Sequence, residues 1–293
     1  GNSPEDRIAK LAAFWEELVS DKPMAWTDPL GLSALGPGQY WRNWLNVAAV
    51  RLGGNPPLFR PRSAVEPHEA RVPSLYMVER TLATLERYVD FELLNDGRVR
   101  FCCAATDIET GECVVFDTAA GVRITPEHVL ASGSLLPAFP PTPIGERLLG
   151  DGGFAANAPL EPFLASDRMA AALPLCLLID LFAADALPPR ALEKVAERST
   201  DLKYACQTEM RLAGIQRERD LELQIESRAA LPGTDLIFLR CQGRPDDTGP
   251  EKVYDFSRSS LADRAKQGAE DAREALRALP TDAGAPGLRV HRV

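Results

Sequence analysis

The chain has 293 residues, of which 45% are hydrophobic, and its 33 basic and 42 acidic side chains give a formal net charge of -9 at pH 7. This length and composition can form a substantial core in one large domain or two modest ones, which excludes a wholly disordered chain. The acidic balance, with no block of lysine and arginine, argues against a nucleic-acid partner and against purely electrostatic adsorption to anionic lipid.

Three helices with apolar residues at helical spacing are predicted before residue 90, over 3–18, 40–52 and 74–89. Ser3 can cap the first helix, and Pro4 suits its first turn. The second helix ends at Gly53 after a face rich in tryptophan and leucine. Such an aromatic face is typical of a protein core, with lipid contact as the alternative.

The apolar period shortens after residue 95, where strands are expected. Val99–Ala105 and Cys113–Phe116 flank a turn and are expected to pair as a hairpin. Thr125 is expected to cap a short helix over the residues that follow it. Leu175–Asp180 is an apolar run with the length of a strand, and we expect it to be buried on both faces of a parallel sheet.

Charged helical sequence follows the double proline Pro188-Pro189. The elements predicted there are a helix over 190–219, strands over 221–226 and 235–240, a helix over 259–279 and a loose tail. Strands that alternate with helices in this way indicate an α/β layered domain. The double proline is the one domain boundary that the sequence suggests, between residues 1–187 and 188–293.

Cysteine and histidine show no metal-binding pattern. The six cysteines are Cys102, Cys103, Cys113, Cys176, Cys206 and Cys241. None has zinc-ligand spacing, so we expect buried free thiols in a reducing compartment. His68, His128 and His291 are scattered, so we expect neither a metal nor another cofactor. The sequence has no apolar run of the roughly 18 residues that span a bilayer and does not begin with a signal peptide. We therefore expect a cytoplasmic protein, with peripheral membrane contact as an open alternative.

The sharpest chemical signal is the run Gly150-Asp151-Gly152-Gly153. Its three glycines free the backbone around one carboxylate and allow a partner to approach closely. A carboxylate in such a loop is a candidate general base, and an ordinary glycine-rich turn is the alternative. Asp107, at the end of a predicted strand, is expected to cap a turn rather than to assist a site.

The order of motifs around this loop is specific. It comprises Ala105-Thr106-Asp107, Thr110-Gly111-Glu112, Ala131-Ser132-Gly133-Ser134 with Phe139-Pro140-Pro141, and Asp151-Gly152-Gly153 with Asn157 and Pro159-Leu160. This order resembles the latter half of the patatin-like phospholipase domain. The resemblance implies an α/β fold of three layers, α/β/α, and a lipid or other acyl ester as the substrate.

The family implies roles for four residues. In it, an aspartate in an Asp-Gly-Gly loop pairs with a serine in a Gly-x-Ser-x-Gly elbow, as a dyad without histidine. Asp151 then takes the role of the base, Gly152 and Gly153 form its loop, and Asn157 supports the loop. The chain would thus belong to a serine-dependent carboxylic ester hydrolase.

The chain itself contains no Gly-x-Ser-x-Gly. Ser33 comes nearest, but Leu35 stands where the second glycine belongs, and no strand precedes it. Because the elbow precedes the matched region in the family, we expect the serine to lie upstream of Gly1 and this chain alone to be inactive. A sheet without its leading strands exposes apolar surface, so we also expect poor solubility.

Motifs near residue 85 and beyond residue 180 resemble a bacterial subgroup of the family that carries an additional C-terminal region. These motifs are 82–90, 180–182, 188–202 and Tyr254–Arg258. Two other functions stay open. One is a non-catalytic lipid-binding or regulatory module that keeps the fold. The other is self-association through the C-terminal helices, which mix apolar and charged faces.

Overall fold

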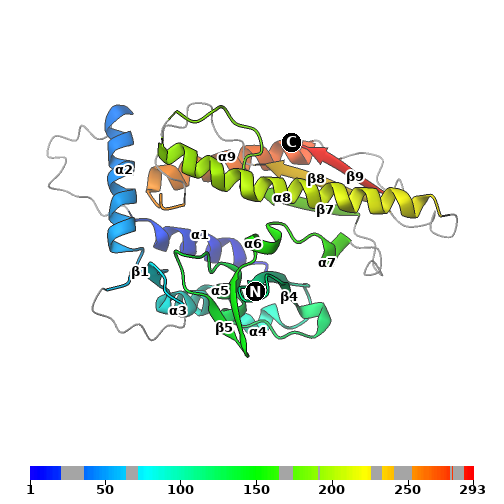
Figure 1. Cartoon of the computed structure of the whole chain (residues 1–293), viewed down its shortest axis with the longest axis horizontal. Coiled ribbons are helices and arrows are strands. Elements are labelled where there is room, and N and C mark those ends of the chain that lie inside the picture. The colour runs from blue at the N-terminus through cyan, green and yellow to red at the C-terminus, as the bar shows by residue number, and fades with distance from the viewer. Residues whose placement is uncertain are drawn as a thin grey trace. The chain divides into compact units, whose positions relative to one another are not determined.

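The structure, a computed structural model, describes residues 1–20, 36–63, 72–164, 174–190, 192–225, 233–240, 253–277, 279 and 287–293. Its helices are α1 (Arg7–Leu18), α2 (Gly36–Gly53), α3 (Glu79–Tyr88), α4 (Phe91–Leu94), the 3-10 helix η2 (Thr118–Ala120), α5 (Pro126–Ser132), α6 (Gly153–Ala156), α7 (Glu161–Leu164), α8 (Leu192–Leu223) and α9 (Arg258–Arg277). Its strands are β1 (Arg60–Pro61), β2 (Tyr76–Met77), β3 (Cys102–Asp107), β4 (Cys113–Asp117), β5 (Thr142–Ile144), β6 (Arg147–Asp151), β7 (Leu175–Asp180), β8 (Thr234–Arg240) and β9 (Leu288–Arg292) (Figure 1). This mixture of helices and sheets confirms the predicted α/β class.

The chain forms two compact units. Unit 1 consists of Gly1–Ala155 and Thr248–Ala262, and unit 2 consists of Ala156–Asp247 and Asp263–Val293. The predicted division at residue 188 concerns the family domain and its extension, and it stays a prediction.

Unit 1 contains a four-stranded sheet in the order β4-β3-β6-β5, in which every pair is antiparallel. Strands β3 and β4 form the predicted hairpin, with Cys102 opposite Asp117. Helix α5 packs on this sheet through Ala131, which shares a buried cluster with Ala105 and Leu149. The antiparallel hairpins suit the short connections between these strands, because only parallel strands need a crossover segment.

Helix α5 begins as the sequence predicts. Thr125 is its N-cap, and the Thr125 amide donates a 3.0 Å hydrogen bond to Nδ1 of His128. Pro126 occupies the first turn, where its missing amide hydrogen costs nothing. His128 therefore has a structural partner at the start of a helix.

A second core of unit 1 joins segments that are far apart in the sequence. Val50, Phe59, Tyr76 and Ala138 are its buried members. Tyr254 and Phe256 pack against this cluster. The ring centroids of Tyr76 and Tyr254 lie 6.1 Å apart. A segment predicted to belong to the C-terminal region is thus part of unit 1.

Helix α1 begins later than predicted and does not bury its stripe. The Ser3 hydroxyl accepts a 3.2 Å hydrogen bond from the amide of Asp6, which closes a turn, and the helix follows from Arg7. Ile8 and Trp15 are 70% and 46% exposed. Leu18 is the buried residue of the helix.

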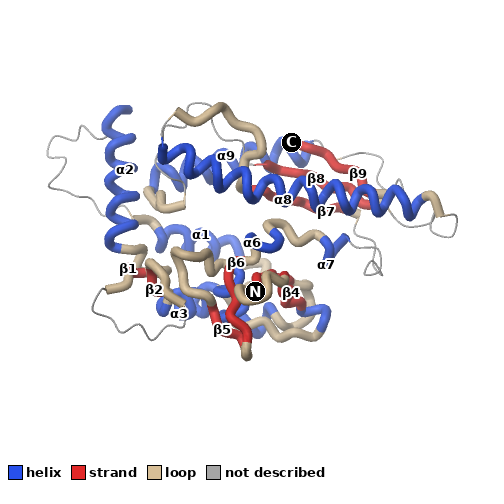
Figure 2. The backbone as a smooth tube through the Cα atoms, viewed as in Figure 1, coloured by secondary structure: helices blue, strands red, loops and turns tan. Residues whose placement is uncertain are grey.

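Unit 2 contains a parallel sheet in the order β7-β8-β9. The long helix α8 runs beside these strands (Figure 2) and packs Leu212 and Ile215 against Leu178, Leu236 and Phe238. The predicted parallel strand at Leu175–Asp180 is confirmed. Its predicted burial on both faces is wrong, because exposed and covered residues alternate along it.

Two further predictions in unit 2 are corrected. The strand predicted over 221–226 is wrong, because α8 continues to Leu223. The tail predicted to be loose forms β9, which pairs in parallel with β8. Its ladder neighbour gives the reason: Asp235 holds Arg289 with hydrogen bonds of 2.8 and 2.7 Å, and Oδ1 of Asp235 lies 2.9 Å from Nε2 of His291. A local sequence pattern does not contain such a long-range pair.

Candidate functional site

Asp151 is the last residue of β6, and the helix α6 begins two residues later. The amide of Gly153 donates a 2.7 Å hydrogen bond to Oδ1 of Asp151. Among the described residues, Oδ2 of Asp151 has no hydrogen-bond partner. One carboxylate oxygen is therefore fixed by the backbone, and the other is available to a further group.

Gly152 lies against the neighbouring strand. A Cβ atom at this position would overlap the carbonyl oxygen of Ala104, so a residue larger than glycine requires the backbone to move. The amide of Asp151 donates a 2.9 Å hydrogen bond to the carbonyl oxygen of Ser134, and that of Gly152 reaches Ser132 at 3.4 Å. The small residues after α5 thus bind the loop from the other side, as the sequence motif predicts.

Thr106 is a site residue that sequence reasoning missed as an individual. Its hydroxyl donates a 2.8 Å hydrogen bond to the carbonyl oxygen of Asp151 and accepts one of 3.1 Å from the amide of Ala155. The side chain is buried, with 6% exposure of the residue. The signal was present in the motif Ala105-Thr106-Asp107, but the pairing of β3 with β6 was needed to give it a role.

The environment of Asp151 changes its protonation. Burial raises the pKa of its carboxyl group above the ordinary value, and the hydrogen bond from Gly153 opposes this effect. A carboxylate with a raised pKa is a stronger base than an exposed one. The electrostatics of this position therefore suit the acceptance of a proton.

Asp107 caps a turn, as predicted. Its Oδ1 accepts hydrogen bonds of 3.0 Å from the amide of Glu109 and 3.2 Å from that of Thr110. Its Oδ2 lies 3.8 Å from Nε of Arg147. The carboxylate is thus engaged within the β3–β4 hairpin and its neighbour.

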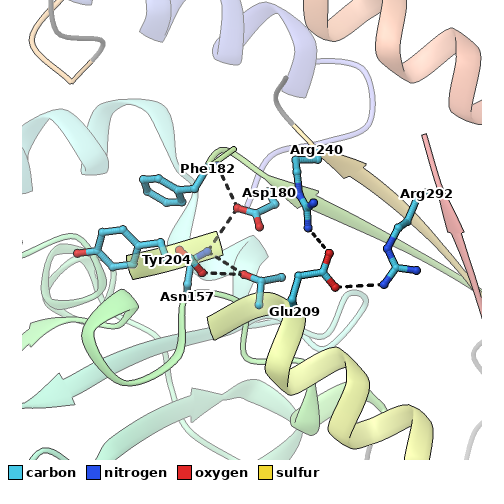
Figure 3. A network of polar contacts seen from close by, with 8 residues as sticks. Asn157, Asp180, Phe182, Tyr204, Glu209, Arg240 and Arg292 are labelled. Carbon is cyan, nitrogen blue, oxygen red and sulfur yellow. Dashed lines mark hydrogen bonds and ion pairs between the residues drawn. The ribbon is translucent and has the colours of Figure 1, made fainter. Parts of the chain in front are cut away.

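Asn157 takes part in a polar network of unit 2 (Figure 3). Its Nδ2 donates to Oγ1 of Thr208 at 3.0 Å and lies 3.5 Å from Oδ1 of Asp180. The Asp180 oxygen also accepts a 3.0 Å hydrogen bond from the amide of Phe182. These contacts join the end of β7 to α8, and the predicted support of the aspartate loop by Asn157 stays a prediction.

The same network includes two arginines at the carboxyl ends of β8 and β9 (Figure 3). Arg240 and Arg292 both form ion pairs with Glu209 of α8. The guanidinium of Arg240 also lies 4.6 Å from the ring centroid of Phe238. The carboxyl edge of the parallel sheet is thus tied to the helix that covers it.

Cysteine provides no nucleophile in the hairpin beside Asp151. Burial raises the pKa of Cys102 to about 11 and that of Cys103 to about 12, so both are neutral thiols at pH 7, and the thiolate is the reactive form. Cys206 is exposed, which corrects the expectation that the thiols are buried. Ser33 and Cys241 lie outside the described residues. Within those residues, no group of three or more histidine, cysteine or acidic side chains has the arrangement of a metal site.

Comparison with known proteins gives one match. A family model described as "Patatin-like phospholipase" matches residues 1–164, which include β3, β6 and the Asp151 loop. No curated protein matches the sequence. In the described part of the chain, no helix is both long and apolar enough to span a bilayer.

Proposed function

The chain belongs to the patatin-like phospholipase family, a family of lipid hydrolases, and on this premise we propose that Asp151 is the catalytic base of a serine–aspartate dyad. The serine is supplied by a segment outside these 293 residues. The substrate is the acyl ester of a phospholipid or neutral lipid. A cytoplasmic location with peripheral membrane contact is part of this proposal.

The carboxylate of Asp151 carries the proposal. Oδ1 is held by the amide of Gly153 at 2.7 Å, and burial raises the pKa of the group. Thr106 and the small residues after α5 fix the backbone on both sides of it. Such preorganisation is what a base needs, since proton transfer requires a fixed geometry within hydrogen-bond reach.

Acylation begins when the serine oxygen attacks the ester carbonyl carbon and its proton moves to Asp151. The tetrahedral intermediate then expels the alcohol, which takes the proton from Asp151. Water next attacks the acyl-serine and gives a proton to the same carboxylate. Collapse of the second intermediate releases the fatty acid, and the serine oxygen regains its proton. Asp151 ends in its original ionised state.

Labelling with a fluorophosphonate, a reagent for activated serines, tests this function. The 293-residue chain is expected to remain unlabelled. A longer polypeptide that includes the sequence encoded upstream is expected to be labelled at one serine and to hydrolyse p-nitrophenyl butyrate. Asp151→Asn in the longer polypeptide should lower hydrolysis by about 10²–10⁴-fold, the usual contribution of a general base.

Glu146→Gln is the matched control, because it neutralises an exposed carboxylate in the turn between β5 and β6. It should leave hydrolysis unchanged. Specific labelling of the 293-residue chain, or full hydrolysis by Asp151→Asn, would contradict the assignment.

A non-catalytic lipid-binding or regulatory module is the alternative, because these 293 residues contain no Gly-x-Ser-x-Gly. It predicts that the longer polypeptide sediments with phosphatidylcholine vesicles and is not labelled.

A further inference from the structure

Strand β7 forms one edge of the parallel sheet, and its outer side has no strand partner in the described chain. Leu175 lies opposite Asp235, and the amide of Asp235 donates a 3.0 Å hydrogen bond to the carbonyl oxygen of Pro174. In a parallel ladder this register directs the peptide groups of even-numbered β7 residues toward β8. The peptide groups of Leu175, Leu177 and Ile179 therefore point to the open edge.

The same three residues expose their side chains. Leu175 is 38%, Leu177 53% and Ile179 67% exposed, while Leu178 between them is buried in the core against α8. Ile237 of β8, on the same face of the sheet, is fully buried. The cover of this face thus ends before it reaches β7.

The two edges of the sheet differ in chemistry. Strand β9 carries Arg289, His291 and Arg292 within five residues. Charged side chains on an edge strand discourage the addition of further strands. Strand β7 has no charged residue between Leu175 and Ile179. Parallel sheets are normally covered on both faces, so an aliphatic face beside an open edge is incomplete.

We propose that a further parallel strand adds to the open edge of β7, and that this strand leads into the serine elbow. The inference rests on the proposed function, which requires a serine-bearing segment. A Gly-x-Ser-x-Gly elbow is a strand, a sharp turn and a helix, with the serine beyond the carboxyl end of the strand. The strand would pair with the peptide groups of Leu177 and Ile179, and the helix would cover their side chains.

The carboxyl end of β7 carries an acceptor that the described residues leave unused. Asp180 is 2% exposed, and its Oδ2 is buried without a hydrogen-bond partner in the part of the chain that the structure describes. An unsatisfied buried oxygen costs about 1–3 kcal/mol. The turn after an added parallel strand brings backbone amides to this end of the sheet, where Asp180 lies (Figure 3).

A second copy of the chain fits the edge less well. Two β7 strands related by a twofold axis would pair antiparallel and place two aliphatic faces side by side. That pairing satisfies the peptide groups but leaves Leu177 and Ile179 uncovered in both copies. A segment that brings its own helix covers them.

Hydrogen exchange of individual amides tests the inference. In the 293-residue chain, the amides of Leu175, Leu177 and Ile179 should exchange fast, and those of Cys176 and Leu178 should exchange slowly. In the longer polypeptide all five should be slow, with protection of the three outward amides raised at least tenfold. Fast exchange of these three amides in the longer polypeptide would overturn the inference. Protection in the 293-residue chain that rises with its concentration would also overturn it, in favour of a second copy.

Charge reversal of the edge gives an independent readout. The double variant Leu177→Lys, Ile179→Lys should leave the circular dichroism of the 293-residue chain unchanged and lower fluorophosphonate labelling of the longer polypeptide at least tenfold. Leu221→Lys is the control, because Leu221 is 62% exposed on α8 of the same unit. Unchanged labelling of the double variant would refute strand addition at β7.

The two proposals can fail separately. Protected β7 amides without serine labelling would retain the added strand and refute the hydrolase. A labelled serine with fast β7 amides would do the reverse.

Discussion

The hydroxyl of Thr106 donates to the carbonyl oxygen of Asp151 at 2.8 Å and accepts from the amide of Ala155 at 3.1 Å. One side chain of β3 therefore holds both ends of the segment that carries the carboxylate. The relationship makes Thr106 a positioning residue for Asp151.

Thr106→Val should destabilise unit 1 by about 1–3 kcal/mol, because it leaves the Ala155 amide without its acceptor at a buried position. Urea unfolding of the 293-residue chain measures the loss. In the longer polypeptide the variant should lower kcat more than it raises KM, since the base is displaced while lipid binding persists. Thr106→Ser keeps the hydroxyl and should restore most of kcat. Equal rates for the valine and serine variants would count against a positioning role.

Asp151→Asn should raise the melting temperature of the 293-residue chain at neutral pH. The pKa of Asp151 is raised in the folded protein, so the folded state binds the proton more tightly than the unfolded state. Stability is then lost as pH rises from the ordinary value of 3.8 through the raised pKa. The amide cannot ionise and avoids this loss. The gain in melting temperature should grow with pH and vanish below the ordinary value.

Calorimetry at a series of pH values checks this dependence. Glu146→Gln, in the exposed turn between β5 and β6, should show no such trend. A gain for Asp151→Asn that is equally large at low pH would have another cause.

Gly152→Ala should destabilise unit 1 by about 1–3 kcal/mol, the usual cost of forcing extra atoms into a packed site. The new methyl group would overlap the carbonyl oxygen of Ala104, and backbone atoms move less readily than side chains. Gly53→Ala is the matched control, since a Cβ there meets nothing within 4 Å. Chemical denaturation of both variants gives the comparison. A Gly152→Ala protein as stable as the control would show that the loop can withdraw from β3.

Thr208→Val should cost about 1–3 kcal/mol in unit 2. Oγ1 of Thr208 is fully buried and accepts the 3.0 Å hydrogen bond from Asn157, so the substitution leaves that amide without this partner. Thr200→Val serves as the control, because Oγ1 of Thr200 bonds only to the Ala196 carbonyl of its own helix among the contacts given for it. Thermal unfolding should separate the two, and equal losses would mean that the Asn157 contact adds nothing.

Elements with a strong local signal could be predicted from the sequence. Alternation and turn residues gave the β3–β4 hairpin, and the N-cap residue Thr125 gave the start of α5. Helices α8 and α9 follow from long charged sequences with helical spacing. In each case the residues that decide the structure are close together in the chain.

Elements that depend on distant partners could not be predicted. The tail folds as β9 because β8 and the Asp235 carboxylate receive it, and local propensity contains neither. The segment 221–226 has apolar residues at a spacing that suits a short strand, yet α8 extends through Leu223. The same limit applies to the site: the motif identified the Asp151 loop, but the role of Thr106 depends on the pairing of β3 with β6.

Unit 1 is completed by residues that follow almost all of unit 2 in the sequence. The carbonyl oxygen of Phe256 accepts a 3.0 Å hydrogen bond from the amide of Ser20, and Arg258 pairs with Glu16 at 2.6 Å. During translation, these contacts form only after the ribosome has made more than about 250 residues. Contacts of such high sequence separation slow folding. The nascent first half must therefore wait for its last piece, and a chaperone that shields Tyr76 and its neighbours during this interval would raise the yield of folded protein.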